Sequence, residues 1–402
     1  MLKKIGLFHI VPFLLASLIF VFLYHLFISD IIDNHVNIKP LKTTEISGKQ
    51  EVHAGKYGNL SEVDHAELEF IASIKSKNQL TLMGSSEFTY SKFTTYKYLP
   101  AKKNYQVLGI GHAHHQSLSM LIELLAAHPE NLNTKIVFFI SPGWFNTEGT
   151  NSKAFVEYAR PNFLNRIIND STISLEYKEY LGQYIDSRLN EFDGVSKSMT
   201  SFMKIFIDNQ TNYISLKKLK QNIKDNFKGT ISKPIIENIN YKLNITNTIK
   251  NSTFLNYDSI AKALQLKFIS NIQSNSIYVN DNYYNKYLSN KKESILNQPN
   301  LKTNEEYLDF KLLLKYVIER KMEASFIILP LNPYYYKNTE VFLPLIDSIK
   351  LNLEKHDLPY YNLYVSDTLS YDPGILNDVM HFGDYGWMKV NKYIDSLYYG
   401  NH

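Results

Sequence analysis

The stretch Leu80-Thr81-Leu82-Met83-Gly84-Ser85-Ser86-Glu87 joins a short apolar run to a glycine-serine turn. Leu80 to Met83 is typical of a buried strand, and Gly84 permits a tight turn at its end. A serine just after such a strand lies at the carboxyl edge of an open α/β sheet, where these sheets bind ligands. We expect a helix to begin behind Ser86, with its N–H groups facing any anion bound there. Taken alone, these residues are more typical of a helix N-cap.

Four more apolar runs predict buried strands, and helical patterns follow them. The runs are Gln106 to Gly111, Lys135 to Ser141, Ser325 to Leu331 and Pro359 to Val365. Helical patterns cover Gln116 to His128 and Tyr307 to Arg320, and a terminal helix runs to about Tyr398. This alternation predicts an α/β fold in which helices cover both faces of a parallel sheet, giving three layers.

The chain divides into three parts by composition. Residues 1–30 form an apolar segment, residues 31–75 a polar stalk with a helix from Ala66 to Ile74, and residues 76–402 the α/β domain. Within that domain, residues from about 154 to 302 have long polar helical periods and Asn-rich breaks. We interpret them as a helical insertion that separates the first three strands from the last two.

The apolar run from Ile5 to Ile28 predicts a transmembrane helix. At about 1.5 Å per residue it makes about 36 Å of helix, enough to cross a hydrocarbon core of about 30 Å. No small-residue cleavage site follows the run, so we expect an uncleaved anchor. Lys3 and Lys4 precede it, whereas Asp30 and Asp33 follow it. The positive-inside rule then places the amino terminus in the cytoplasm and the remainder outside the cell.

Composition and missing motifs exclude several kinds of protein. A formal net charge of +4 gives no basic footprint for nucleic acid. The chain has no cysteine, which removes disulfides and thiolate chemistry. Gly109-Ile110-Gly111 follows a predicted strand, but His114 stands where the dinucleotide fingerprint needs its third glycine. No phosphate-binding loop or helix-borne zinc pair occurs. We therefore expect no cofactor and no catalytic metal.

A serine nucleophile needs a histidine base held by a carboxylate. Asp378 precedes His381 by three residues, a spacing that can bring the carboxylate to the imidazole Nδ1 within a loop. The comparable pair Glu62 and His65 lies in the polar stalk. Ser86, Asp378 and His381 are therefore the predicted catalytic residues, with a capping or core histidine as the alternative for His381.

Residues after the second and third strands are candidates for oxyanion or substrate binding. A main-chain N–H at Gly111 is one predicted donor, and the Gln116 amide is another. Trp144, in Ser141-Pro142-Gly143-Trp144-Phe145, either walls the site or seals the core. The histidines at 112, 114 and 115 are close enough in sequence to share a cation. They fit the lining of the cleft better, because no carboxylate or cysteine lies beside them.

Several of these motifs occur in one order along the chain. The anchor is followed by Gly84-Ser85-Ser86-Glu87, Gln116-Ser117-Leu118, Ser141-Pro142-Gly143-Trp144-Phe145, and Asp378 to His381 with Gly386-Trp387. In this order the chain resembles the DltD family of D-alanyl-lipoteichoic acid biosynthesis proteins. The resemblance implies an SGNH-hydrolase-like fold outside a Gram-positive membrane and a role in D-alanine esterification of teichoic acid. It also implies that Ser86 is the nucleophile, Asp378 the orienting acid and His381 the base.

Three functional hypotheses follow. The first is an extracytoplasmic, membrane-anchored serine acyltransferase or esterase in D-alanylation. The resemblance implies that its partners are a teichoic acid polymer and a D-alanyl donor, either a carrier protein or a membrane acyltransferase of the same pathway. The second is an O-acetyltransferase or esterase acting on surface glycans with the same triad. The third is a non-catalytic scaffold that recruits a carrier protein and a membrane acyltransferase.

Overall fold

A computed structural model of the chain describes residues 79–400, apart from 89–90, 104–105, 112, 128–134, 147–148, 151, 153–154, 156–157, 160, 189–190, 192–254 and 292. All of the described residues belong to one compact unit. The anchor, stalk and helix predicted within residues 1–75 lie outside them. Of the helices that the structure does describe, none has the length and apolar character to cross a bilayer.

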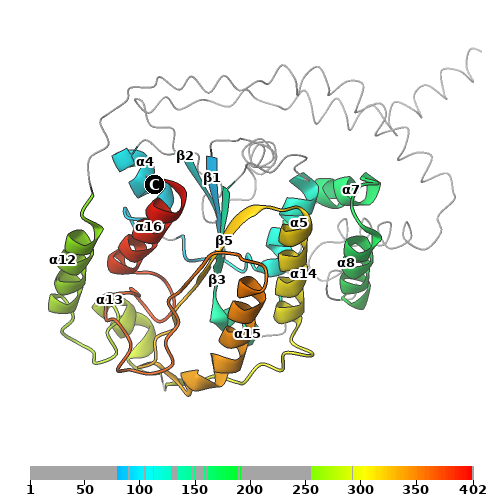
Figure 1. Cartoon of the computed structure of the whole chain (residues 1–402). Coiled ribbons are helices and arrows are strands. Elements are labelled where there is room, and N and C mark those ends of the chain that lie inside the picture. The colour runs from blue at the N-terminus through cyan, green and yellow to red at the C-terminus, as the bar shows by residue number, and fades with distance from the viewer. Residues whose placement is uncertain are drawn as a thin grey trace, which may run out of the picture. The chain divides into compact units, whose positions relative to one another are not determined.

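A five-stranded parallel sheet forms the centre of the unit (Figure 1). Its order is β2-β1-β3-β5-β7. The strands are β1 (Gln79–Gly84), β2 (Gln106–Gly111), β3 (Lys135–Ile140), β5 (Glu323–Ile328) and β7 (Tyr360–Asn362). All five predicted strands and their parallel pairing are confirmed.

Side chains of alternate strand residues enter two separate cores. On β3, Ile136, Phe138 and Ile140 join one cluster, whereas Val137 and Phe139 join the other. The first cluster is covered by α5 (Ser117–Ala127), α14 (Glu305–Glu319) and α15 (Leu343–Glu354), and the second by α4 (Thr95–Lys103) and α16 (Asp384–Tyr398). Helices therefore lie on both faces of the sheet, as predicted (Figure 1).

The described part of residues 154–302 contributes to both outer layers. Helices α7 (Pro161–Asn169) and α8 (Leu175–Ser187) lie on the side of α5, whereas α12 (Tyr257–Ser270) packs against α16 (Figure 1). The segment also holds α13 (Asp281–Tyr283), the π-helical turn η4 (Tyr284–Leu288) and a two-residue strand, β4 (Ser294–Ile295). Strand β4 pairs in parallel with β6 (Tyr336–Lys337) in a second, two-stranded sheet.

Two 3₁₀ turns and one helix cap shape the carboxyl edge of the main sheet. The turn η3 (Pro142–Asn146) follows β3, and η5 (Thr339–Phe342) follows β6. Asn304 caps α14 by accepting a hydrogen bond from the Tyr307 N–H, and its amide donates to the Phe145 carbonyl at 2.8 Å. The start of α14 is thereby fixed beside the end of β3.

The strand order reverses between β1 and β3, because the chain passes from β1 to β2 on one side and then returns to β3 on the other. Open parallel sheets bind ligands in the crevice at such a reversal, outside the carboxyl ends of the strands. Ser86 follows β1 and Ser141 follows β3, so both lie at this crevice.

Candidate active site

Ser86 lies in a tight turn. The prediction that a helix begins directly behind it is wrong. Residues 85–88 form a turn, and the next helix, α4, begins only at Thr95. The Ser85 N–H donates to the Glu87 carboxylate, and Phe88 is buried against Phe139 and Trp387. This burial draws the chain toward the sheet, and residues 85–88 are turn rather than the start of a helix.

Gly111, a predicted oxyanion donor, supports this turn from β2. It pairs with Gly84 in the sheet, and a Cβ added at Gly111 would lie 2.3 Å from a Phe88 ring carbon and 2.9 Å from the Ser85 carbonyl oxygen. Only glycine permits so close an approach. Gly111 lies behind the turn and is not among the residues that line the cavity described below.

His381 joins Ser86 to Asp378 by hydrogen bonds. Its Nε2 lies 2.8 Å from Ser86 Oγ, and its Nδ1 lies 2.7 Å from Asp378 Oδ2. Because a carboxylate only accepts, Nδ1 carries a proton, and the neutral ring then accepts the Ser86 hydroxyl proton at Nε2. The structure thus brings together the three residues predicted from separate parts of the sequence.

The loop that carries His381 is closed on itself. Asp378 Oδ1 accepts the N–H groups of Met380 at 2.9 Å and His381 at 2.8 Å, and the Asn377 N–H donates to the His381 carbonyl at 2.8 Å. The Asn332 N–H donates to the Val379 carbonyl at 3.2 Å. Asn332 is itself fully buried, so the loop rests on the core.

Charge and burial oppose each other at the histidine. Burial by itself lowers the pKa of His381, but the hydrogen bond to Asp378 and the charges of Asp378 and Glu87 outweigh it. The pKa of His381 is therefore raised above its ordinary value. Burial also raises the pKa of Glu87, although backbone N–H groups and the two nearby histidines partly offset it.

A cavity of about 1010 Å³ opens at Ser86 and His381. Gln116 and Trp144, both predicted from the sequence, line it, as does His114. Both Gln116 and Trp144 are buried, with 6% and 8% of their surface exposed. The cavity is large enough for a substrate to reach the serine from outside, so Ser86 is not sealed in the core.

His115 connects the end of β1 to helix α5. Its Nδ1 lies 2.6 Å from the Gly84 carbonyl oxygen, and its Nε2 lies 2.9 Å from the carboxylate of Glu123. Burial lowers the pKa of His115, but Glu123 and the Gly84 carbonyl raise it further, so the net shift is upward. Sequence analysis missed Glu123, although it is the one charged residue in the otherwise apolar helix α5.

The three histidines considered as a shared cation site differ in their surroundings. Among the described residues, no three His, Cys, Asp or Glu side chains gather in a way that could hold a metal ion. His114 is exposed at the cavity, whereas His115 is buried beneath the Ser86 turn. His112 lies outside the described residues.

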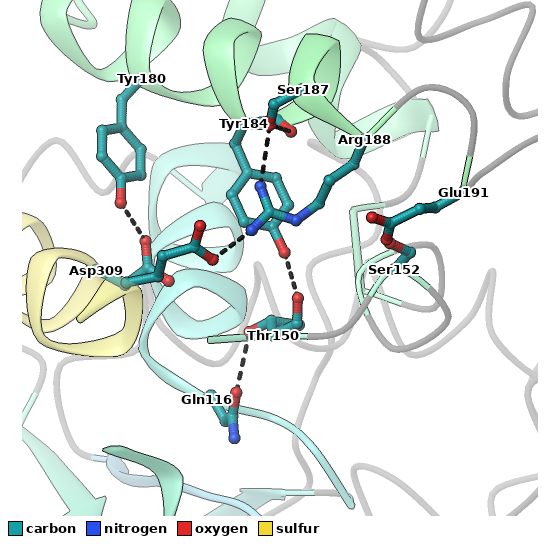
Figure 2. Close-up of polar contacts among 10 residues, drawn as sticks. Gln116, Thr150, Ser152, Tyr180, Tyr184, Ser187, Arg188, Glu191 and Asp309 are labelled. Atoms are coloured by element: carbon teal, nitrogen blue, oxygen red, sulfur yellow. Dashed lines mark hydrogen bonds and ion pairs between the residues drawn. The ribbon is translucent and has the colours of Figure 1, made fainter. Parts of the chain in front are cut away.

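Residues at the end of α8 and the start of α14 also line the cavity. Figure 2 shows the polar contacts that connect them to their neighbours. The Arg188 guanidinium lies 4.0 Å above the centre of the Tyr184 ring and forms an ion pair with Glu305. Tyr184 donates to the Thr150 carbonyl, and the Thr150 hydroxyl donates to the Gln116 amide oxygen at 3.2 Å. No local sequence spacing predicts this group, because its members come from distant segments.

The fold and the site define a class of protein: a parallel α/β protein with a hydrogen-bonded Ser-His-Asp chain at the carboxyl edge of its sheet. The family described as "DltD protein" matches residues 66–399. This chain therefore belongs to the DltD family, which confirms the resemblance found in the sequence.

Two relatives agree with this assignment. The chain is 23% identical over 346 residues to Protein DltD of Bacillus subtilis (strain 168), covering 81% of this chain and 83% of that protein. It is also 23% identical over 342 residues to Protein DltD of Lacticaseibacillus rhamnosus, covering 79% of this chain and 77% of that protein. The similarity thus extends over most of each chain.

Proposed function

We propose that this protein is an extracytoplasmic, membrane-anchored serine acyltransferase or esterase that acts in the D-alanylation of teichoic acid. Membership of the DltD family supports the pathway. One structural observation carries the chemistry: the Asp378–His381–Ser86 chain of hydrogen bonds opens into a cavity. The SGNH-hydrolase-like character of the fold and the anchor in residues 1–30 are parts of the same proposal.

The proposed reaction has two steps. Ser86 Oγ attacks the carbonyl carbon of a D-alanyl ester or thioester while His381 Nε2 accepts the hydroxyl proton. The bond to the leaving group breaks, and His381 returns the proton to that group. A teichoic acid hydroxyl then loses its proton to Nε2 and attacks the acyl-enzyme, and the proton returns to Ser86 Oγ. Asp378 holds the ring and stabilises the imidazolium formed in both steps.

The positive charge of the D-alanyl group explains what the reaction would achieve. Each D-alanyl ester places an ammonium group beside the phosphates of the polymer, which lowers the net negative charge of the wall. The acyl donor would be a carrier protein or a membrane acyltransferase of the same pathway. No cofactor enters this chemistry, because both steps are acyl transfers with proton movement alone.

Replacing Ser86 tests the proposal directly. We expect Ser86→Ala to abolish D-alanyl transfer, measured as ester-linked D-alanine in the wall of cells whose only copy carries the variant. The purified wild-type protein should react covalently with a fluorophosphonate at Ser86, and the variant should not. Ser396→Ala, at an exposed serine of α16, is the matched control.

The outcome also separates the proposal from its alternatives. A trapped Ser86 adduct with the mass of an alanyl group supports D-alanylation, whereas an acetyl adduct favours the surface-glycan reaction. Full D-alanylation in cells that contain only Ser86→Ala would refute the role of Ser86.

A further inference from the structure

The hydroxyl group of Thr150 fixes the orientation of the Gln116 amide. Thr150 is 1% exposed, and its Oγ1 lies 3.2 Å from Gln116 Oε1. A buried hydroxyl proton needs an acceptor, and among the described residues this amide oxygen is the one that Thr150 has. With the amide turned the other way, two donors would face the hydroxyl oxygen and its proton would lose that acceptor.

This orientation leaves the nitrogen of the Gln116 amide available. Figure 2 shows Nε2 directed away from Thr150. Gln116 is 6% exposed, it lines the cavity that contains Ser86, and no described residue accepts a hydrogen bond from Nε2. A nine-tenths buried donor without a protein partner, in the wall of a cavity, is suited to a ligand oxygen.

Tyr184 holds Thr150 in place from helix α8. Its hydroxyl donates to the Thr150 carbonyl, and its ring is 6% exposed beneath the Arg188 guanidinium (Figure 2). Gly149, just before Thr150, has a φ of +80°, a conformation that favours glycine. Helix α8 thus reaches Gln116 through two consecutive hydrogen bonds.

We propose that Gln116 Nε2 donates a hydrogen bond to the oxyanion formed when Ser86 attacks the acyl carbon, and that Thr150 and Tyr184 are positioning residues for that amide. The inference rests on the proposed function and identifies one of its oxyanion donors. In this proposal, Tyr184 of helix α8 helps to orient the Gln116 amide through Thr150. Such pre-organised donors stabilise the transition state without further rearrangement.

Two substitutions at Gln116 separate donation from structure. Gln116→Glu keeps an acceptor for Thr150 but removes both N–H donors, and Gln116→Leu removes the amide altogether. With a D-alanyl thioester of a small thiol as substrate, we expect kcat to fall by about 100-fold in each variant while KM changes little. Gln116→Glu should be the slower of the two, because a carboxylate repels the oxyanion.

The positioning residues should show graded effects. Thr150→Val is expected to lower kcat by about tenfold, since a misdirected donor loses part of its effect, and Thr150→Ser should restore it. Tyr184→Phe should lower kcat less than Thr150→Val does. Tyr180→Phe is the matched control: it lies on the same helix, but its hydroxyl donates to Asp309 at 2.6 Å and does not reach Thr150. Thermal unfolding of every variant verifies that it is folded.

Three results would overturn the inference. Wild-type kcat in Gln116→Glu and Gln116→Leu, beside an inactive Ser86→Ala, would remove the role of the amide and leave the proposed function intact. A change confined to KM would reduce Gln116 to a wall of the cavity. Failure of the wild-type protein to turn over the thioester or to label at Ser86 would refute the proposed function and this inference with it.

Discussion

Asp378 uses both carboxylate oxygens to hold the His381 loop and ring. Oδ1 accepts two N–H groups of its own loop, and Oδ2 accepts the Nδ1–H of His381. The ring is therefore fixed by the same residue that shapes the loop. A substitution at Asp378 that keeps the loop closed but reverses the polarity at Nδ1 would test the tautomer alone.

We expect Asp378→Asn to lower kcat by about 10⁴-fold, because an amide N–H facing Nδ1 favours the tautomer with its proton on Nε2. Loss of the carboxylate also lowers the pKa of His381, which Asp378 holds above its ordinary value. His381 must be neutral to act as a base. The wild-type rate should thus fall as the pH drops through the raised pKa.

Two measurements test the expected pH dependence and the change in the His381 pKa. The pH dependence of fluorophosphonate labelling gives the acid limb of the wild-type protein, and NMR titration gives the His381 pKa in both proteins. A His381 pKa that is the same in Asp378→Asn as in the wild type would contradict this account.

The sequence predicted Ser86, Asp378 and His381 as a set because each has a local signal: a strand-end turn for the serine, and an acid three residues before the histidine. Arg188 and Thr150 have no such signal. They reach the cavity only because α8 packs beside α14, and sequence spacing does not encode that packing. Glu123 did leave a signal, a single charge in an apolar helix, which marks a buried carboxylate with a partner.

At the scale of the elements, α14 connects its neighbours through two buried carboxyl groups. Glu306 Oε1 accepts the Ser117 N–H at 3.1 Å and hydroxyl at 2.6 Å at the start of α5, and Asp309 accepts the Tyr180 hydroxyl of α8. Each carboxyl group has a second oxygen without a partner in the described residues. Burial raises the pKa of both groups, and their mutual repulsion adds to the shift at Glu306.

A raised pKa means that the folded state binds these protons more tightly than the unfolded state. The pair therefore stabilises the fold below the ordinary carboxyl pKa of about 4, and this contribution is lost as the pH rises through the raised values. The free energy of unfolding should decline over this range. Glu306→Gln should reduce this decline. At pH 9 its free energy of unfolding should exceed that of the wild type by at least about 1.4 kcal/mol, the equivalent of one pKa unit.

Chemical denaturation at a series of pH values measures this effect. Glu179→Gln, at an exposed residue of α8, is the control and should leave the pH dependence as it is in the wild type. Parallel curves for Glu306→Gln and the wild type would show that the buried pair does not carry the pH dependence.

The elements also differ in how well the sequence predicted them. Four of the main strands are largely buried apolar runs, and β7 is a half-buried strand within the predicted run Pro359 to Val365, so runs of apolar residues revealed all five. Strands β4 and β6 have two residues each, too few for a pattern, and the sequence did not predict them. The prediction of a helix behind Ser86 was wrong because Phe88 packs against Gly111 and Trp387, a tertiary contact that overrides local preference.

At the scale of the whole molecule, Trp387 joins α16 to the turn that follows β1. It is fully buried on α16, and its ring contacts Phe88 after β1, Phe139 on β3 and Phe382 beside the His381 loop. The tryptophan thus supports both the serine turn and the histidine loop. The order of the five strands depends on such long-range packing, which is why the sequence predicted the strands but not their order.

We expect Trp387→Ala to lower the free energy of unfolding by about 3–5 kcal/mol, because it leaves a cavity between Phe88 and Phe382. Trp387→Phe should cost much less. It keeps an aromatic ring and removes an indole N–H that has no partner among the described residues. Urea denaturation measures both variants, and equal losses would contradict the packing argument.

Ser86 and His381 are separated by 295 positions in the chain. A ribosome therefore has to synthesise the chain past residue 381 before the two side chains can meet. A nascent chain that ends before residue 381 carries the Ser86 hydroxyl but lacks the imidazole to which it is hydrogen-bonded. Under the proposed function, such a shortened product would lack the base of the Ser86 reaction.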